Sequence, residues 1–306
     1  RLLKQCFGYT EFRKGQWGVI ENILSRRNTI AVFPTGGGKS LCYQLPALMM
    51  PGTTIVISPL ISLMKDQVDS LVEKGIAASY ISSSVSDNEN ARRIREMANG
   101  AYKIVYIAPE RFQSDAFISA LKHIHIPFIA VDEAHCISQW GHNFRPSYLK
   151  IRELIQLAGN PVVAAFTATA NEKVQKDMVE LLGLSECRLF IGSFDRPNLE
   201  SRIEEPGSAD AYVLNYVRSH PDKPGIVYAS TRRNVEGLYY YLKNNGIGVG
   251  MYHAGLTSEQ RNFYQDRFIS GDVRVMVATN AFGMGIDKSD VRFIIHYNMP
   301  VSMENY

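Results

Sequence analysis

Thr29-Ile-Ala-Val-Phe33 is followed by Pro34-Thr-Gly-Gly-Gly-Lys-Ser40 and then by Leu41-Cys-Tyr-Gln44. The first segment is short and apolar, which is typical of a buried strand. The second is a glycine loop, and the third opens a stretch that favours a helix. Strand, glycine loop and helix in this order predict one unit of a layered α/β domain.

Similar apolar runs recur along the chain. We expect further strands at 53–57, 103–107, 127–131, 161–165, 225–229, 273–278 and 291–296. Their hydrophobicity is continuous rather than alternating, as in parallel strands covered on both faces by helices. Helical apolar spacing is found between them, for example at 60–74, 88–98 and 171–182.

The pattern restarts after Phe194-Asp-Arg-Pro-Asn198 and the Pro, Gly and Ser stretch at 205–208, which suggests a hinge. We therefore predict an α/β fold with two domains, 1–200 and 201–306. The length of 306 residues, with 45% hydrophobic and 21% charged residues, also favours two domains over one.

Charge and cysteine content limit the possible partners and cofactors. The net charge of +3 is too mild to show a polyanion partner. The four cysteines lie far apart without a Cys-x-x-Cys pair, so we expect reduced thiols and no zinc site. No run is long enough to span a bilayer and no signal peptide is present, so we expect no membrane association. The chain begins with Arg rather than Met, which suggests a fragment.

The glycine loop has the chemistry of a phosphate site. Glycines let backbone N–H groups converge on phosphate oxygens, and the following helix N-terminus adds a favourable dipole. Lys39 would reach the outer phosphates and Ser40 would ligate Mg²⁺, with the remaining nucleotide contacts at Thr35, Gly36, Gly37 and Gly38. Phe33 stands where the strict P-loop pattern has glycine, and a glycine-rich turn with a chance Lys-Ser pair is the alternative.

Asp132 and Glu133 follow the expected strand at 127–131. Asp132 suits a residue that holds magnesium either directly or through another ligand, while Glu133 is placed to polarise the attacking water. A solvated turn is the alternative for such a pair. Because a phosphate loop is also present, we favour the metal and water roles.

The segment after this pair is rich in aromatic and cationic residues. It places Trp140, Phe144 and Tyr148 beside His142 and Arg145, a mixture that suits unstacked nucleobases. A small satellite core is the alternative. Two further hydroxyls, those of Thr167 and Thr169, follow another strand and could sense the γ-phosphate.

Other candidates are individually weak. Near the N-terminus, Tyr9 can stack on an adenine, the Gln16 amide can pair with its edge, and Arg13 supplies a cation. In the second domain we consider Ser230 and Thr231 for phosphate contacts, Thr279 for the nucleic-acid backbone, and Asp287 for the ribose or the domain interface. Each is also compatible with ordinary loop structure.

The order of all these segments resembles the RecQ family of DNA helicases, in helicase superfamily two, over essentially the whole chain. The matching segments are Phe7-Gly-Tyr9 with Phe12-Arg13 and Gln16, Thr35 to Ser40, Ser58 to Gln67, Ala108-Pro-Glu-Arg111, Asp132-Glu-Ala-His135 with Ser138 to His142 and Phe144-Arg-Pro146, Phe166 to Ala170, Phe194 to Asn198, Tyr252 to Leu256, and Phe282 to Asp287.

The resemblance implies two tandem RecA-like domains with parallel sheets, the second truncated at its C-terminus, which clamp Mg-ATP between them. It further implies 3′→5′ translocation on single-stranded DNA and action on partly duplex DNA in repair and recombination. Tyr9, Arg13 and Gln16 would hold adenine. Trp140 and Phe144 would contact bases, Gln139, His142 and Arg145 would link DNA to the ATP site, and Lys65 and Arg111 would contact the DNA backbone.

The family's Gln-x-x-Gly-Arg-x-Gly-Arg segment, which supplies an arginine finger, falls beyond Tyr306. We therefore expect this piece to bind ATP but to hydrolyse it weakly. We also expect a monomer inside the cell, in the cytoplasm at a bacterial nucleoid or in a nucleus. Two alternatives stay open: an ATP-gated nucleic-acid-binding module without turnover, and an RNA-unwinding relative.

Overall fold

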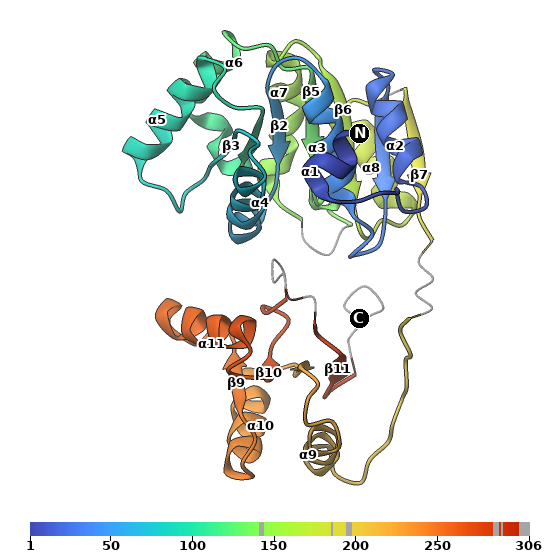
Figure 1. Ribbon diagram of the computed structural model, residues 1–306, viewed down its shortest axis with the longest axis vertical. Coiled ribbons are helices and arrows are strands. Elements are labelled where there is room, and N and C mark those ends of the chain that lie inside the picture. The colour runs from blue at the N-terminus through green and yellow to red at the C-terminus, as the bar shows by residue number, and fades with distance from the viewer. Residues whose placement is uncertain (141–143, 185, 194–197, 284–287, 289, 300–306) are drawn as a thin grey trace. The chain divides into compact units, whose positions relative to one another are not determined.

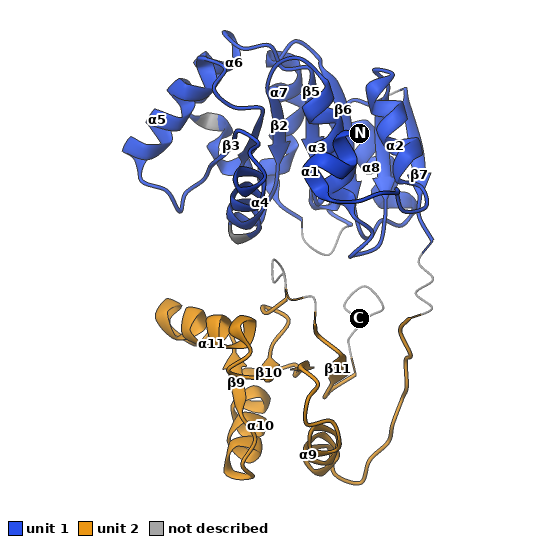
Figure 2. Ribbon diagram, in the orientation of Figure 1, with its two compact units in different colours: residues 1–196 blue, residues 197–306 orange. Residues whose placement is uncertain are grey.

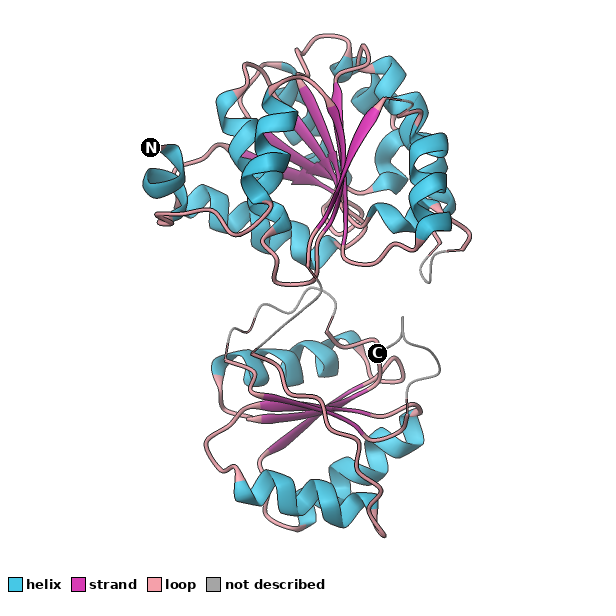
Figure 3. Cartoon of the chain, turned by 90° about the vertical axis from the view of Figure 1, so that its right-hand side faces the viewer, coloured by secondary structure: helices cyan, strands magenta, loops and turns pink. Residues whose placement is uncertain are grey.

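The computed structural model describes all residues except 141–143, 185, 194–197, 284–287, 289 and 300–306. It divides into two compact units, residues 1–196 and residues 197–306 (Figure 2). Each unit is a parallel sheet with helices on both sides (Figure 3). The predicted α/β class with two parallel-sheet domains is therefore confirmed.

The described residues of unit 1 form a seven-stranded sheet in the order β3-β4-β2-β5-β6-β1-β7. Figure 1 labels β2, β3, β5, β6 and β7 of this sheet. The strands are β1 Asn28–Val32, β2 Thr54–Ile57, β3 Ala78–Ile81, β4 Ile104–Ile107, β5 Phe128–Val131, β6 Val162–Thr167 and β7 Cys187–Ile191. The helices are α1 Leu2–Phe7, α2 Gln16–Leu24, α3 Lys39–Met49, α4 Ile61–Glu73, α5 Asp87–Ala98, α6 Asp115–Leu121, α7 Ile151–Leu157 and α8 Glu172–Leu182. The described part of unit 1 also includes three 3₁₀ turns, namely η1 Pro109–Gln113, η2 Ala134–Ile137 and η3 Pro146–Lys150.

The sheet of unit 1 is buried on both faces, which explains why its strand sequences are continuously apolar. Successive residues of β1 alternate between two cores: Ile30 and Val32 belong to one, and Ala31 belongs to the other. The first core is closed by α5, α6, α7 and α8, and the second by α2, α3 and α4.

Unit 2 holds four strands in the order β11-β8-β10-β9. They are β8 Gly225–Tyr228, β9 Val249–Tyr252, β10 Val275–Ala278 and β11 Phe293–His296, with the helices α9 Ala209–Ser219, α10 Arg232–Asn244 and α11 Ser258–Ser270. Its larger core packs α9 and α10 against one face of the sheet, and Phe268 of α11 packs on the other.

Three strands escaped the sequence prediction. β3 includes a serine and a half-buried tyrosine, β9 contains Gly250, and β7 is an edge strand whose residues are all at least partly exposed. None of the three shows the apolar run that marked the others. Among the described residues, no helix combines the length and the hydropathy needed to cross a bilayer.

Candidate functional site

The candidate site of unit 1 lies at the carboxyl ends of three neighbouring strands. β5, β6 and β1 are adjacent in the sheet, so the residues that follow them meet at one edge. Lys39 and Ser40 begin α3 after β1, Asp132 and Glu133 follow β5, and Thr167 ends β6 with Thr169 just beyond. The structure thus brings together the phosphate-loop and acidic residues predicted from the sequence.

The phosphate loop, residues 34–40, has a backbone that requires glycine. Gly36 and Gly38 have φ values of 74° and 76°, and a Cβ at Gly37 would lie 2.9 Å from the carbonyl oxygen of Pro34. Gly38 is the N-cap of α3, and no side chain caps that helix end. The first N–H groups of α3 are therefore suited to an anion. The Lys39 Nζ donates to the Phe33 carbonyl at 3.3 Å.

Two predicted adenine residues hold the phosphate loop in place. The buried Gln16 amide Nε2 donates to the carbonyls of Gly37 and Gly38, at 3.3 and 3.2 Å. Its Oε1 accepts the Arg13 backbone N–H at 2.8 Å, and the Arg13 guanidinium donates to the Gly36 carbonyl. Tyr9, on the segment before α2, is 54% exposed. The adenine role of these residues stays a prediction.

The two acids at the end of β5 differ in their surroundings. Asp132 is only 6% exposed, and its Oδ1 accepts the Glu133 N–H at 3.0 Å. Burial, and then the Glu133 carboxylate, raise the Asp132 pKa to about 7, while Lys39 opposes the shift. Glu133 is a left-handed residue with φ 47°, a strained conformation for a side chain of this size.

His135 connects the acids to the neighbouring strand. Its Nδ1 lies 2.9 Å from the Thr167 hydroxyl and 3.3 Å from Glu133 Oε2. Thr167 is buried, and its hydroxyl also accepts the Thr169 N–H at 3.2 Å. On the other side, the buried Tyr148 donates its hydroxyl proton to the Asp132 carbonyl at 2.9 Å. The acidic pair is therefore held from two directions.

The aromatic loop, residues 138–148, is attached to α8. The Ser138 hydroxyl donates to Asp177 Oδ2 at 2.5 Å and accepts the Trp140 N–H at 3.1 Å. Lys173 places its ammonium 4.8 Å from the centre of the Trp140 ring, which is 68% exposed. Gln139 and Phe144 also lie in this loop, and His142 lies outside the described residues.

Arg145, at the far end of the aromatic loop, contacts other strand ends. Its guanidinium donates to the Pro59 carbonyl at 3.1 Å and lies 3.8 Å from Glu110. Among the predicted DNA-backbone residues, Arg111 donates to the Ser82 carbonyl at 3.3 Å, and Lys65 is exposed on α4. Their DNA contacts stay predictions.

In unit 2 the described candidate residues have hydrogen-bond partners within the unit. The Thr231 hydroxyl caps α10 by accepting the Asn234 N–H at 3.1 Å. The Ser230 hydroxyl donates to Asn298 Oδ1 at 3.0 Å, and the Thr279 N–H donates to the Tyr252 carbonyl at 3.1 Å. Asp287 lies outside the described residues.

Sequence reasoning missed four residues that shape the site: His135, Tyr148 as a support for Asp132, and Lys173 with Asp177 on α8. His135 stands within the Asp-Glu-Ala-His run, so its position offered a signal. Lys173 and Asp177 offered none, because charged residues on an amphipathic helix usually face solvent. Across the described part of the chain, no group of three or more His, Cys, Asp or Glu residues could hold a metal alone.

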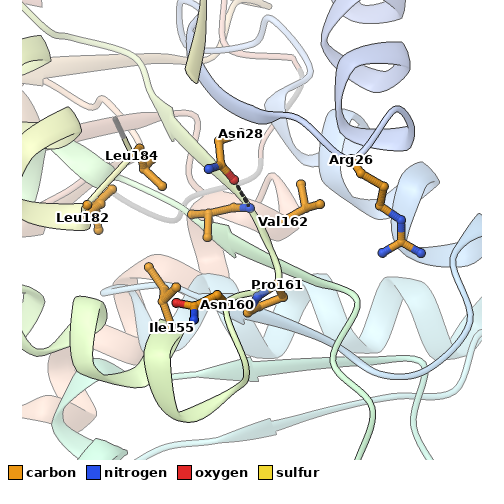
Figure 4. A pocket seen from close by; sticks show the side chains of 10 residues that line it. Arg26, Asn28, Ile155, Asn160, Pro161, Val162, Leu182 and Leu184 are labelled. Carbon is orange, nitrogen blue, oxygen red and sulfur yellow. Dashed lines mark hydrogen bonds between the residues drawn. The ribbon is translucent and has the colours of Figure 1, made fainter. Parts of the chain in front are cut away.

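A separate cavity lies at the opposite edge of the unit 1 sheet (Figure 4). It measures about 230 Å³ and lies beside Asn28 and Val162, the first residues of β1 and β6. Asn28 Oδ1 accepts the Val163 N–H there at 3.0 Å, which ties the two strands together. This cavity is remote from the strand ends that carry the site.

Comparisons with known families match both units. Residues 13–177 match the DEAD/DEAH box helicase family, and residues 209–306 match the helicase conserved C-terminal domain. The chain is 48% identical to ATP-dependent DNA helicase RecQ of Bacillus subtilis (strain 168) over 100% of its own length and 52% of that protein. It is 43% identical to RecQ of Pasteurella multocida (strain Pm70), over 100% of the chain and 48% of that protein. The chain thus spans about half the length of these curated relatives.

Solved structures show the same fold. A DUF1998 helicase, MrfA, bound to DNA has a TM-score of 0.77 at 19% identity, covering 99% of this chain and 47% of that one. Saccharomyces cerevisiae Dbp5 bound to RNA and ADP BeF3 has a TM-score of 0.75 at 18% identity, covering 99% and 79%. The predicted resemblance to RecQ helicases is confirmed, as are tandem helicase domains.

Proposed function

We propose that this chain, which belongs to the DEAD/DEAH box helicase family, is the motor core of an ATP-driven 3′→5′ DNA translocase that separates duplexes. Membership of the family implies the use of ATP. The proposal is carried by one observation: the phosphate loop, the acidic pair and the attachment of the aromatic loop meet at adjacent strand ends. A nucleotide site and a base-stacking surface then share one edge of the sheet.

The residues present fit Mg-ATP. The α3 N-terminus without a side-chain cap and the glycine-dependent loop suit phosphate oxygens, and Lys39 supplies a cation. Ser40 and Asp132 would hold magnesium, which neutralises phosphate charge when bound. Glu133, whose carboxylate is partly exposed, would orient the attacking water and accept its proton. Burial, and then the Glu133 carboxylate, raise the pKa of Asp132 to about 7, and a bound cation would oppose that shift.

Coupling would run through His135. This side chain contacts both Glu133 and Thr167, and the 3₁₀ turn that contains it leads directly into Ser138 of the aromatic loop. A base that moves Trp140 would therefore alter the position of Glu133 through His135. We propose single-stranded and partly duplex DNA as the substrate, and repair or recombination as the setting.

The test is ATP hydrolysis with and without a 20-nucleotide oligothymidylate, followed by strand displacement from duplexes with a 3′ or a 5′ tail. We expect weak hydrolysis that the oligonucleotide stimulates, and displacement only with the 3′ tail. Equal rates with and without DNA would exclude a motor and leave an ATP-gated binding module. Stronger stimulation by an oligouridylate of equal length would identify an RNA-dependent relative.

A further inference from the structure

Two residues of α8 contact the aromatic loop from outside the ATP site. Lys173 lies over the Trp140 ring, and Asp177 accepts the Ser138 hydroxyl at 2.5 Å. They are four residues apart, so they project from the same face of the helix. Lys176 is exposed on the same helix.

The Asp177 contact fixes the backbone that carries Trp140. The Trp140 N–H donates to the Ser138 oxygen, and the Ser138 hydroxyl donates to the Asp177 carboxylate. A hydroxyl that donates to a carboxylate forms a short, charge-assisted hydrogen bond, which is stronger than a neutral one. The start of the aromatic loop is therefore tied to α8 rather than free to follow a ligand.

The Lys173 contact covers the surface that a base would use. Trp140 is 68% exposed, yet the ammonium of Lys173 stands 4.8 Å from its ring centre. Nucleobases bind aromatic side chains by stacking on a ring face, so a base approaching this face meets the ammonium first. A cation–π contact at an exposed site is weaker than base stacking, and a base can therefore displace it.

We propose that Lys173 and Asp177 are positioning residues that hold Ser138 and Trp140, at the start of the aromatic loop, in a DNA-free arrangement, with one face of Trp140 covered until a base displaces Lys173. This inference rests on the proposed function, because it assumes that Trp140 stacks on DNA bases. Lys173 then opposes DNA binding although it is a cation. A lysine that simply paired with phosphate would favour binding.

The two roles of Lys173 therefore predict opposite changes in DNA affinity when the lysine is removed. The chain has two tryptophans, so Trp17→Phe leaves Trp140 as the only indole and allows its fluorescence to report stacking. In that background, oligothymidylate of 20 nucleotides is titrated at fixed salt. Lys173→Ala should lower the midpoint of Trp140 quenching by about two- to fivefold, the range of an exposed cation–π contact. Lys176→Ala is the matched control and should leave the midpoint unchanged.

Asp177 provides a second, independent measurement. Asp177→Ala should raise ATP hydrolysis without DNA relative to hydrolysis with DNA, because the loop start is released. Asp177→Asn keeps an acceptor for Ser138 and should stay close to the parent protein. A general structural defect would lower both rates together and would not be rescued by asparagine.

The outcomes separate the two proposals. Normal quenching with a midpoint that is unchanged or raised by Lys173→Ala overturns the positioning role and leaves the motor in place. The positioning role is also overturned if the ratio of ATP hydrolysis with and without DNA is the same in Asp177→Ala as in the parent protein. Failure of oligothymidylate to quench Trp140 in the Trp17→Phe protein overturns this inference alone. Failure to stimulate ATP hydrolysis overturns the proposed function and this inference with it.

Discussion

The strand ends of the two units carry similar polar residues in different settings. In unit 1, Asp132, His135 and Thr167 are buried and bound to one another or to neighbouring strands. In unit 2, Ser230 and Thr231 are exposed; Ser230 donates its hydroxyl proton to Asn298 Oδ1, and Thr231 caps α10. Buried polar groups need partners, so the unit 1 residues are fixed before any ligand arrives. The exposed groups of unit 2 are free to exchange partners at little cost.

The largest expected effect concerns the acidic pair of unit 1. Glu133→Gln should lower ATP hydrolysis by about 10²- to 10⁴-fold, because it removes the group that accepts the proton of the attacking water. Nucleotide affinity should change little, since the phosphate loop is untouched. Rates under saturating nucleotide and binding of a fluorescent ATP analogue measure the two quantities. Glu153→Gln, on the exposed face of α7, is the matched control, and equal loss in both variants would remove Glu133 from the reaction.

The buried Asp132 of unit 1 can be tested by its effect on the free energy of unfolding. Its pKa is raised to about 7 from an ordinary value of 3.8, so the folded protein binds more protons than the unfolded chain between these pH values. Stability without ligand therefore falls as the pH rises from about 4 toward 7, as the buried carboxyl ionises. Asp132→Asn removes that ionisation and should be the more stable protein at pH 8, by on the order of 2 kcal/mol.

Thermal unfolding of both proteins at pH 5 and pH 8, without nucleotide, measures this effect. The advantage of Asp132→Asn should be smaller at pH 5. An advantage that is equal at both pH values would show that charge burial is not its cause. Added Mg-ATP should reverse the order, because only the carboxylate is a good magnesium ligand.

Sequence reasoning could place the candidate site in the fold because its residues follow apolar strands. The phosphate loop and Asp132-Glu133 each stand directly after such a run, so strand prediction also placed these candidate residues at the strand ends. The contacts between elements were not visible in the same way. His135 with Thr167 and Trp140 with Lys173 join residues that are more than 30 positions apart, and such pairs depend on strand order. The edge strand β7 was missed because exposure removes the apolar signature.

Gln16 tests whether the phosphate loop of unit 1 is also fixed by hydrogen bonds before a ligand arrives. Gln16→Ala removes the amide that donates to the Gly37 and Gly38 carbonyls, and we expect nucleotide affinity to fall about tenfold, equivalent to about 1.4 kcal/mol. Adenosine and inorganic triphosphate should be compared as competitors. Loss of affinity for triphosphate indicates support of the loop, whereas loss confined to adenosine indicates adenine recognition. Gln5→Ala on α1 is the control.

Thr231 gives the smallest effect and tests the unit 2 side of the comparison. Its hydroxyl accepts the Asn234 N–H and so caps α10. Thr231→Ala should cost about 1 kcal/mol of unit 2 stability, while Thr231→Ser keeps the cap. If capping is its only role, DNA affinity should be the same in all three proteins once unit 2 is folded. A loss of DNA affinity in Thr231→Ala that serine restores would show that an exposed cap can also serve as a phosphate contact, and that the two units differ less than their burial suggests.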